Sequence, residues 1–160
     1  MLKAIHRLKY DGRTALAKPL GKLLASALPN CDPLLDGRTV LDAFDVVIPV
    51  PLHPSRLKTR GFNQAELLAR EVCAGTGWHL EIGNLQRVRK TPTQTAMTME
   101  ERAANVLGAF TLRETRPMLH KQVLIVDDVL TSTSTAREIA RVIAEAGASR
   151  VCVCALARSA

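Results

Sequence analysis

The amino-acid sequence predicts an α/β fold in which helices cover a mostly parallel sheet. With 160 residues, of which 47% are hydrophobic, the chain has the size and apolar content of one domain with one core. Aromatic residues make up only 3%, so aliphatic side chains form the apolar mass, as is typical of helices packed on a buried sheet. Between 121 and 156, the order strand, turn, helix, strand indicates a βαβ unit, which makes its strands parallel.

Two helices are expected at the N-terminus. Apolar residues recur at helical spacing from Leu2 to Leu28, and Asp11-Gly12 interrupts them as a turn. The segment 29–33 contains two prolines and ends this helical region.

Strands and helices then alternate along the chain. Asp45 to Val50 is a β-branched run stopped by prolines, typical of a buried parallel strand whose carboxyl end forms a ligand edge. Asn63 to Val72 is rich in helix formers, and glycines lie beyond its end. The other expected elements are a strand at 85–88, an exposed loop at 89–99, one or two helical turns at 100–106, strands at 108–112 and 121–126, a helix at 136–146 and a strand at 150–156.

The positive charge of the chain favours anionic partners. The formal net charge is +7, and a basic surface attracts phosphates, nucleic acids and acidic membranes without choosing among them. The cations gather in two stretches, and an ordinary solvated helix face explains the first stretch as well as a binding patch does. The first stretch contains Lys3, Arg7, Lys9, Arg13, Lys18 and Lys22, and the second contains Arg56, Lys58 and Arg60.

The cysteines and the apolar pattern indicate a protein of the reducing cytoplasm. The four cysteines include no C-x-x-C pair, and Cys152 and Cys154 alternate with valines as on one face of a strand. This favours buried free thiols over a metal site. No apolar segment is long enough to span a membrane, and the first residues lack the apolar core of a secretory signal.

A candidate sugar-phosphate site lies inside the βαβ unit. Asp127 and Asp128 come where the central strand is expected to end, and the hydroxyl-rich run Thr131 to Thr135 begins the next helix. Backbone N–H groups at a helix N-terminus form a phosphate cradle, whereas adjacent carboxylates repel phosphate and accept hydrogen bonds from vicinal hydroxyls. The combination predicts a ribose 5-phosphate site. A simpler alternative stays open, in which two acids merely end a strand before a Ser/Thr helix cap.

The same motif resembles the signature of the type I phosphoribosyltransferases, which is an apolar strand, two acids, two apolar residues and a Thr/Ser–Thr/Ser–Gly–x–Thr turn. Val123 to Thr135 matches it except that Thr133 replaces the glycine. More narrowly, the chain resembles the ComF family, also called GntX-like. The resemblance covers nearly the whole chain and is carried by Leu8-Lys-Tyr-Asp-Gly12, Val50-Pro-Leu-His-Pro54 with Arg56, Arg60-Gly-Phe-Asn-Gln-Ala65, Arg87 with Thr91-Pro92 and Gln94, Glu101-Arg102 with Asn105, Gly108-Ala-Phe110 and Ala155-Leu-Ala-Arg158.

Two departures from the family pattern bear on function. Thr133 brings a branched Cβ where the backbone should approach the phosphate closely or take a positive φ, which opposes tight phosphate binding and turnover. Many ComF-like proteins carry an N-terminal four-cysteine zinc module, and this chain begins after the point where that module would end, so no zinc is expected. We expect one phosphoribosyltransferase-like domain over 1–160, with a hood of N-terminal helices at 1–40 and no zinc module.

The resemblance implies that the ligand is phosphoribosyl pyrophosphate (PRPP), bound with Mg²⁺. It makes Asp127 and Asp128 the catalytic residues. For His53 an ordinary loop position, for Arg60 a purely structural role, and for the segment 89–99 an ordinary mobile surface loop remain open alternatives. The implied binding residues are Val129, Leu130, Thr131, Ser132, Thr133, Ser134 and Thr135 in the phosphate turn, Pro51, Leu52, His53, Arg56 and Arg60 near the pyrophosphate, and Arg102, with Thr91 and Gln94 in a loop at 89–99 that folds over the site.

Three functions remain open at this stage. The first is transfer of the phosphoribosyl group, with loss of pyrophosphate, to a nitrogen acceptor that the sequence does not identify. The second, implied by the ComF resemblance, is an accessory role in natural transformation, in which the protein binds incoming single-stranded DNA beside a helicase-like competence protein. Such DNA binding would be weak in sequence preference and strongly salt-dependent, since the few aromatic residues are scattered. The third is a pocket that senses a nucleotide or PRPP without turnover. The sequence does not indicate an oligomeric state.

Overall fold

The computed structural model describes residues 1–30, 42–90, 99–131 and 133–158. In this part of the chain, four strands form a parallel sheet in the order β2-β1-β5-β6. Two further strands, β3 (Leu85–Arg87) and β4 (Phe110–Leu112), pair antiparallel beside it. The predicted α/β class with a mostly parallel sheet is confirmed. The parallel strands are β1 (Val46–Pro49), β2 (His79–Leu80), β5 (Gln122–Leu130) and β6 (Arg150–Arg158).

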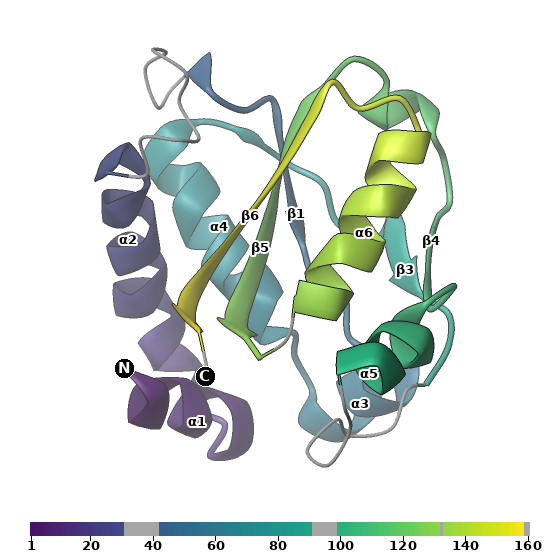
Figure 1. Cartoon of the computed structure of the whole chain (residues 1–160). Coiled ribbons are helices and arrows are strands. Elements are labelled where there is room, and N and C mark those ends of the chain that lie inside the picture. The colour runs from purple at the N-terminus through teal and green to yellow at the C-terminus, as the bar shows by residue number, and fades with distance from the viewer. Residues whose placement is uncertain (31–41, 91–98, 132, 159–160) are drawn as a thin grey trace.

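Helices cover both faces of the parallel sheet (Figure 1). The helices α2 (Ala17–Ala27) and α4 (Gln64–Thr76) lie on one face, and α6 (Thr133–Glu145) lies on the other. Alternate residues of β5 divide between the two cores, because successive strand residues point to opposite faces. Leu124 and Val126 pack with α2 and α4, whereas Val123 and Ile125 pack with α6.

One glycine allows the helices of the first face to approach closely. Gly21 of α2 is buried, and a Cβ at this position would collide with the Cβ of Glu71 on α4. Any side chain at residue 21 would therefore push the two helices apart.

Three helices gather near the carboxyl end of β5 (Figure 1). They are α1 (Leu2–Tyr10), α3 (Pro54–Arg60) and α5 (Met99–Val106). Ile5 and Leu8 are the buried residues of α1, with exposed fractions of 2% and 0%. Ligands of parallel α/β sheets bind beyond the carboxyl ends of the strands, so this end of the sheet is where a site is expected.

The sequence predictions for β5 and α6 need correction at their boundary. The strand was expected to end before Asp127, but it continues to Leu130 because β6 extends to Arg158 and pairs with it beyond the acids. The helix begins at Thr133, three residues before the predicted start. Thr131 of the hydroxyl-rich segment thus follows the strand, and Thr133 to Thr135 form the first turn of α6.

The other predicted elements agree with the structure within the described residues, although the predicted loop at 89–99 lies mostly outside them and Met99 already belongs to α5. The predicted turn at Asp11-Gly12 separates α1 from α2, with a 3-10 turn at Thr14–Leu16 between them. The sequence did not indicate α3 or the two-residue strand β2. Cys152 is buried and Cys154 is half-buried, neither forms a disulfide, and both pack in the core of the α2 and α4 face. Within the described residues, no helix has the length and hydropathy needed to cross a membrane.

Candidate functional site

The acidic pair lies on β5 near its carboxyl end. The side chain of Asp128 is buried, and Asp127 is half-buried. Neighbouring strand residues point to opposite faces of the sheet. The two residues are nevertheless joined by a hydrogen bond, because a carboxylate oxygen of Asp127 accepts the backbone N–H of Asp128 at 2.8 Å. Burial, and next the charge of Asp128, raise the pKa of Asp127 to about 7. Asp127 is therefore poised to change protonation near neutral pH.

Lys9 of α1 completes this acidic site. Its Nζ lies 2.8 Å from Oδ2 of Asp128, and the Asp128 side chain is only 3% exposed. The sequence analysis placed Lys9 in a basic stretch and did not assign it to the site. The signal that could have identified it was its position within Leu8-Lys-Tyr-Asp-Gly12, one of the segments that carry the ComF resemblance.

A basic pocket lies between the end of α1 and helix α3. It has a volume of about 660 Å³, a size typical of small-molecule sites. Its described lining residues include four cations and no acid, so it favours an anionic ligand. Asp127, Asp128 and the turn 131–135 are not among these lining residues, and Lys9 connects the pocket with the acidic pair. The four cations are Lys9, Arg56, Arg60 and Lys90.

The loop from β1 to α3 contributes predicted residues in different ways. Leu52 and Arg56 line the basic pocket, and Pro51 with Leu52 lines a smaller cavity of about 140 Å³. His53 instead caps α3, because its Nδ1 accepts the backbone N–H of Ser55 at 3.2 Å. The structure thus gives His53 a structural role at the helix N-terminus.

Asn63 holds this loop against α4. Its side-chain oxygen accepts the N–H of Ala65 at 3.1 Å, which makes it the N-cap of α4. Its side-chain nitrogen donates to the carbonyl of Val50 at 3.0 Å. One side chain therefore fixes both the start of α4 and the start of the segment that follows β1.

Arg60 is both a pocket cation and a structural residue. It donates to Oε1 of Gln64 at 2.6 Å, and Gln64 is itself buried. The Arg60 guanidinium also lies 5.4 Å from the centre of the Tyr10 ring, which is a cation–π contact. Arg60 therefore joins α3 to the end of α1 across the pocket.

The predicted phosphate turn follows β5 directly. Val129 and Leu130 are the last residues of the strand, Thr131 is exposed, and Ser132 lies outside the described residues. Thr133, Ser134 and Thr135 form the first turn of α6 and are half-buried. Among described non-glycine residues, a positive φ occurs only at His120, so Thr133 does not take the left-handed conformation considered for this position.

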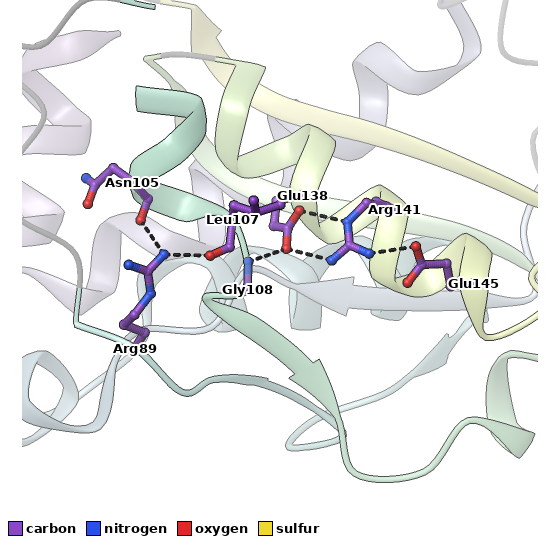
Figure 2. A network of polar contacts seen from close by, with 7 residues as sticks. All are labelled: Arg89, Asn105, Leu107, Gly108, Glu138, Arg141 and Glu145. Carbon is purple, nitrogen blue, oxygen red and sulfur yellow. Dashed lines mark hydrogen bonds and ion pairs between the residues drawn. The ribbon is translucent and has the colours of Figure 1, made fainter. Parts of the chain in front are cut away.

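A polar network ties α6 to both flanks of the segment 91–98 (Figure 2). Arg89, on one flank, donates to the carbonyls of Asn105 and Leu107 on the other, at 3.0 and 2.6 Å. The Gly108 N–H then donates to the buried carboxylate of Glu138 on α6 at 2.7 Å. The predicted loop residues Thr91 and Gln94 lie outside the described residues. Arg102 belongs to α5, and its side chain is likewise outside the described part.

Curated relatives match almost the whole chain, although no protein-family model does. The DNA utilization protein YhgH of Salmonella typhimurium is 35% identical over 156 residues, which are 97% of this chain and 66% of that protein. Competence protein F of Haemophilus influenzae is 33% identical over 161 residues, with the same coverage. Competence protein ComFC of Streptococcus pneumoniae is 28% identical, over 95% of this chain and 60% of that protein. The chain belongs to the ComF family.

The fold of this ComF-family chain is that of the type I phosphoribosyltransferases. Glutamine PRPP amidotransferase from B. subtilis, solved with ADP and GMP, aligns with a TM-score of 0.53 over 86% of this chain and 25% of that enzyme. The allosteric regulatory enzyme of purine biosynthesis aligns with a TM-score of 0.51 over 88% of this chain and 25% of that enzyme. Identities of 24% and 23% make these likenesses of fold alone. The chain spans slightly less than two thirds of the length of the YhgH protein and of competence protein F.

Proposed function

We propose that this ComF-family chain binds PRPP at the carboxyl end of β5. The observation that carries the proposal is the ion pair between Lys9 and Asp128, because it joins the acidic pair to a pocket of about 660 Å³ whose charged lining residues, among those described, are all cations. Carboxylates accept hydrogen bonds from sugar hydroxyls, and arginine and lysine pair with phosphates. A sugar that carries several phosphates fits both the acidic pair and the cationic pocket.

The phosphate turn supplies the third part of the proposed site. The first N–H groups of a helix have no acceptor within the helix and favour an anion. In α6 these groups begin at Thr133, three residues after the end of the strand that carries the acids. The 5-phosphate would bind there, with the pyrophosphate directed toward Arg56 and Arg60.

The chemistry of the site fits Mg²⁺ that arrives with the ligand. The described residues contain no group of three His, Cys, Asp or Glu side chains that could hold a metal ion. Mg²⁺ in proteins is commonly held by one or two carboxylates together with substrate phosphates. Asp127 and Asp128 would contribute the carboxylates, and the metal would neutralise charge on the pyrophosphate.

The reaction that such a site supports is displacement of pyrophosphate by a nitrogen nucleophile. The bond from the anomeric carbon to the pyrophosphate oxygen breaks, a carbon–nitrogen bond forms, and the nitrogen loses its proton. Positive charge that develops on the sugar ring would be stabilised by the carboxylates of Asp127 and Asp128. Arg56 and Arg60 would bind the departing pyrophosphate. The proposed hood that selects the acceptor is the N-terminal segment 1–40.

Calorimetric titration with PRPP and Mg²⁺ tests the proposal. We expect micromolar binding that is lost in the Asp127→Asn/Asp128→Asn double variant, because the amides remove the negative charges while conserving side-chain size. The matched control is Glu145→Gln, which removes an exposed carboxylate on α6. Wild-type protein that does not bind PRPP, or a double variant that binds equally well, would refute the proposed site.

A second candidate function is a cytoplasmic accessory role in DNA uptake, in which the chain binds single-stranded DNA beside a helicase-like competence protein. Two observations favour it: the curated relatives are named DNA utilization and competence proteins, and exposed cations cluster on α1 and α2. Lys9 does not belong to this surface, because it pairs with Asp128. The exposed cations are Lys3, Arg7, Lys18 and Lys22.

Salt-dependent binding of a fluorescent oligonucleotide separates the two candidates. An electrostatic DNA surface predicts weaker binding by Lys3→Ala/Arg7→Ala and a shallower dependence on salt, with no effect of Asp127→Asn/Asp128→Asn. If the double aspartate variant alone changes oligonucleotide binding, the nucleic acid occupies the acidic site and the surface role is excluded.

A further inference from the structure

Two consecutive residues of α1 hold this helix against the proposed ligand site. Lys9 pairs with Asp128 of β5, and the ring of Tyr10 faces the guanidinium of Arg60 on α3. Both partners, Asp128 and Arg60, are residues that the ligand would need. The end of α1 is therefore attached through groups for which a bound ligand would compete.

The ammonium of Lys9 separates Asp128 from the pocket. Asp128 is 3% exposed and does not line the described pocket, whereas Lys9 is 21% exposed and does. A buried carboxylate without a counterion or hydrogen-bond donors is strongly destabilised. A ligand can therefore take this carboxylate from Lys9 only if it brings its own donors.

The displaced ammonium needs a new partner as well. After release it stays on the wall of a pocket that Arg56, Arg60 and Lys90 also line. Among these cations an ammonium without an anion is repelled, and a phosphate group removes the repulsion. Only a ligand with both hydroxyl donors and a nearby phosphate satisfies Asp128 and Lys9 together.

We propose that Lys9 is a specificity-determining residue that moves from Asp128 to a phosphate of the ligand, and thereby selects sugar phosphates with vicinal hydroxyls. This inference rests on the proposed sugar-phosphate site and adds the property by which the site distinguishes ribose from deoxyribose. A sugar phosphate without the full diol leaves Lys9 on Asp128 and binds through the remaining cations alone.

Ribose 1,5-bisphosphate and 2-deoxyribose 1,5-bisphosphate test this role, because each carries a phosphate on the anomeric carbon, where the proposed site directs it toward Lys9, and the two differ in one hydroxyl at equal charge. Both are titrated calorimetrically into the wild type, Lys9→Met and Lys3→Met. Lys3 is exposed on the same helix and does not line the pocket, so Lys3→Met controls for the loss of charge. We expect the wild type to prefer the ribose compound. In Lys9→Met its affinity should fall about tenfold, as for one lost charge-assisted hydrogen bond, while the affinity for the deoxy sugar stays unchanged.

Two other results would overturn the role of Lys9. An equal loss of affinity for both sugars would mean that Lys9 binds them only as one more cation of the pocket wall. A gain in affinity for the ribose compound would mean that Lys9 only blocks Asp128. Lys9→Arg provides a second test that keeps the charge if Lys9→Met does not fold. Its guanidinium holds a carboxylate with two hydrogen bonds, so the affinity for the ribose compound alone should fall. Wild-type protein that binds neither sugar contradicts the proposed function itself, together with this inference.

Discussion

Glu138 accepts the backbone N–H of Gly108 at 2.7 Å, across thirty residues of sequence. The same carboxylate receives two hydrogen bonds from Arg141, at 2.8 and 2.9 Å, and these hydrogen bonds lower the pKa of Glu138. The helix that begins with the phosphate turn is thus joined to the segment that follows α5. Because Arg89 connects the flanks of residues 91–98, the position of both flanks depends on α6 (Figure 2).

Replacing Glu138 should destabilise the fold. In Glu138→Ala the Gly108 N–H and the Arg141 guanidinium lose a buried acceptor, and we expect a decrease of about 2 kcal/mol in the free energy of unfolding. Glu138→Gln should lose less, because it keeps an acceptor for Gly108. Urea denaturation measures both variants, with Glu145→Gln as the exposed control. If Glu138→Ala were as stable as that control, the hydrogen bonds that Glu138 accepts from Gly108 and Arg141 would contribute nothing to the stability of the fold.

The stability of the protein should depend on pH through Asp127. Its pKa is raised from 3.8 to about 7, so between these values the folded state holds a proton that the unfolded state releases. The free energy of unfolding must therefore fall as the pH rises from about 4 to about 7. Asp127→Asn should remove this fall and be the more stable protein at pH 8. Melting temperatures of both proteins from pH 5 to pH 8 measure the difference, and parallel profiles would exclude a raised pKa.

Thr133→Gly should strengthen binding of sugar phosphates. The substitution removes a branched Cβ from the start of α6, where the backbone is proposed to meet the 5-phosphate. We expect a several-fold gain in affinity for ribose 5-phosphate, measured calorimetrically, together with a small loss of helix stability. Thr133→Ser keeps a hydroxyl on an unbranched Cβ and should lie between the two. Equal affinity in all three proteins would show that Thr133 does not restrict the phosphate site.

Asn63 offers a test of how the loop after β1 is held. Asn63→Ala loses the helix cap and the bond to the Val50 carbonyl, and should lower the free energy of unfolding by about 1–2 kcal/mol. Asn63→Asp keeps the cap but sets a carboxylate against that carbonyl. In guanidinium denaturation, the free energy of unfolding of Asn63→Asp should lie between those of the wild type and of Asn63→Ala. An aspartate variant as stable as the wild type would mean that the Val50 contact contributes nothing.

Most of the fold could be predicted from the sequence, because the residue patterns that indicate strands and helices are local. The continuous apolar run from Val123 to Val126 and the helix formers after Asn63 located β5 and α4. The extension of β5 through Asp127 to Leu130 was missed, since it depends on pairing with the end of β6, which lies about thirty residues later. The helix α3 was missed because it has only seven residues and directly follows the prolines at 49 and 51.

In the candidate site, too, the features that involve neighbouring residues of the sequence could be predicted, whereas contacts between distant residues could not. The motif around Asp127 and Asp128 could be recognised along the chain, whereas the contact of Asp128 with Lys9 joins residues more than a hundred positions apart. Periodicity placed Lys9 on a basic helix but could not show which of its cations turns inward. For His53, the cap of α3 could not be foreseen without α3 itself.

The crystal structure of the complex with PRPP and Mg²⁺ tests the central claim most directly. The account predicts the 5-phosphate at the start of α6, the sugar hydroxyls at Asp127 and Asp128, and the pyrophosphate among Arg56, Arg60 and a Lys9 released from Asp128. A structure in which the Lys9–Asp128 pair is intact and PRPP is absent, or is bound elsewhere, would contradict it.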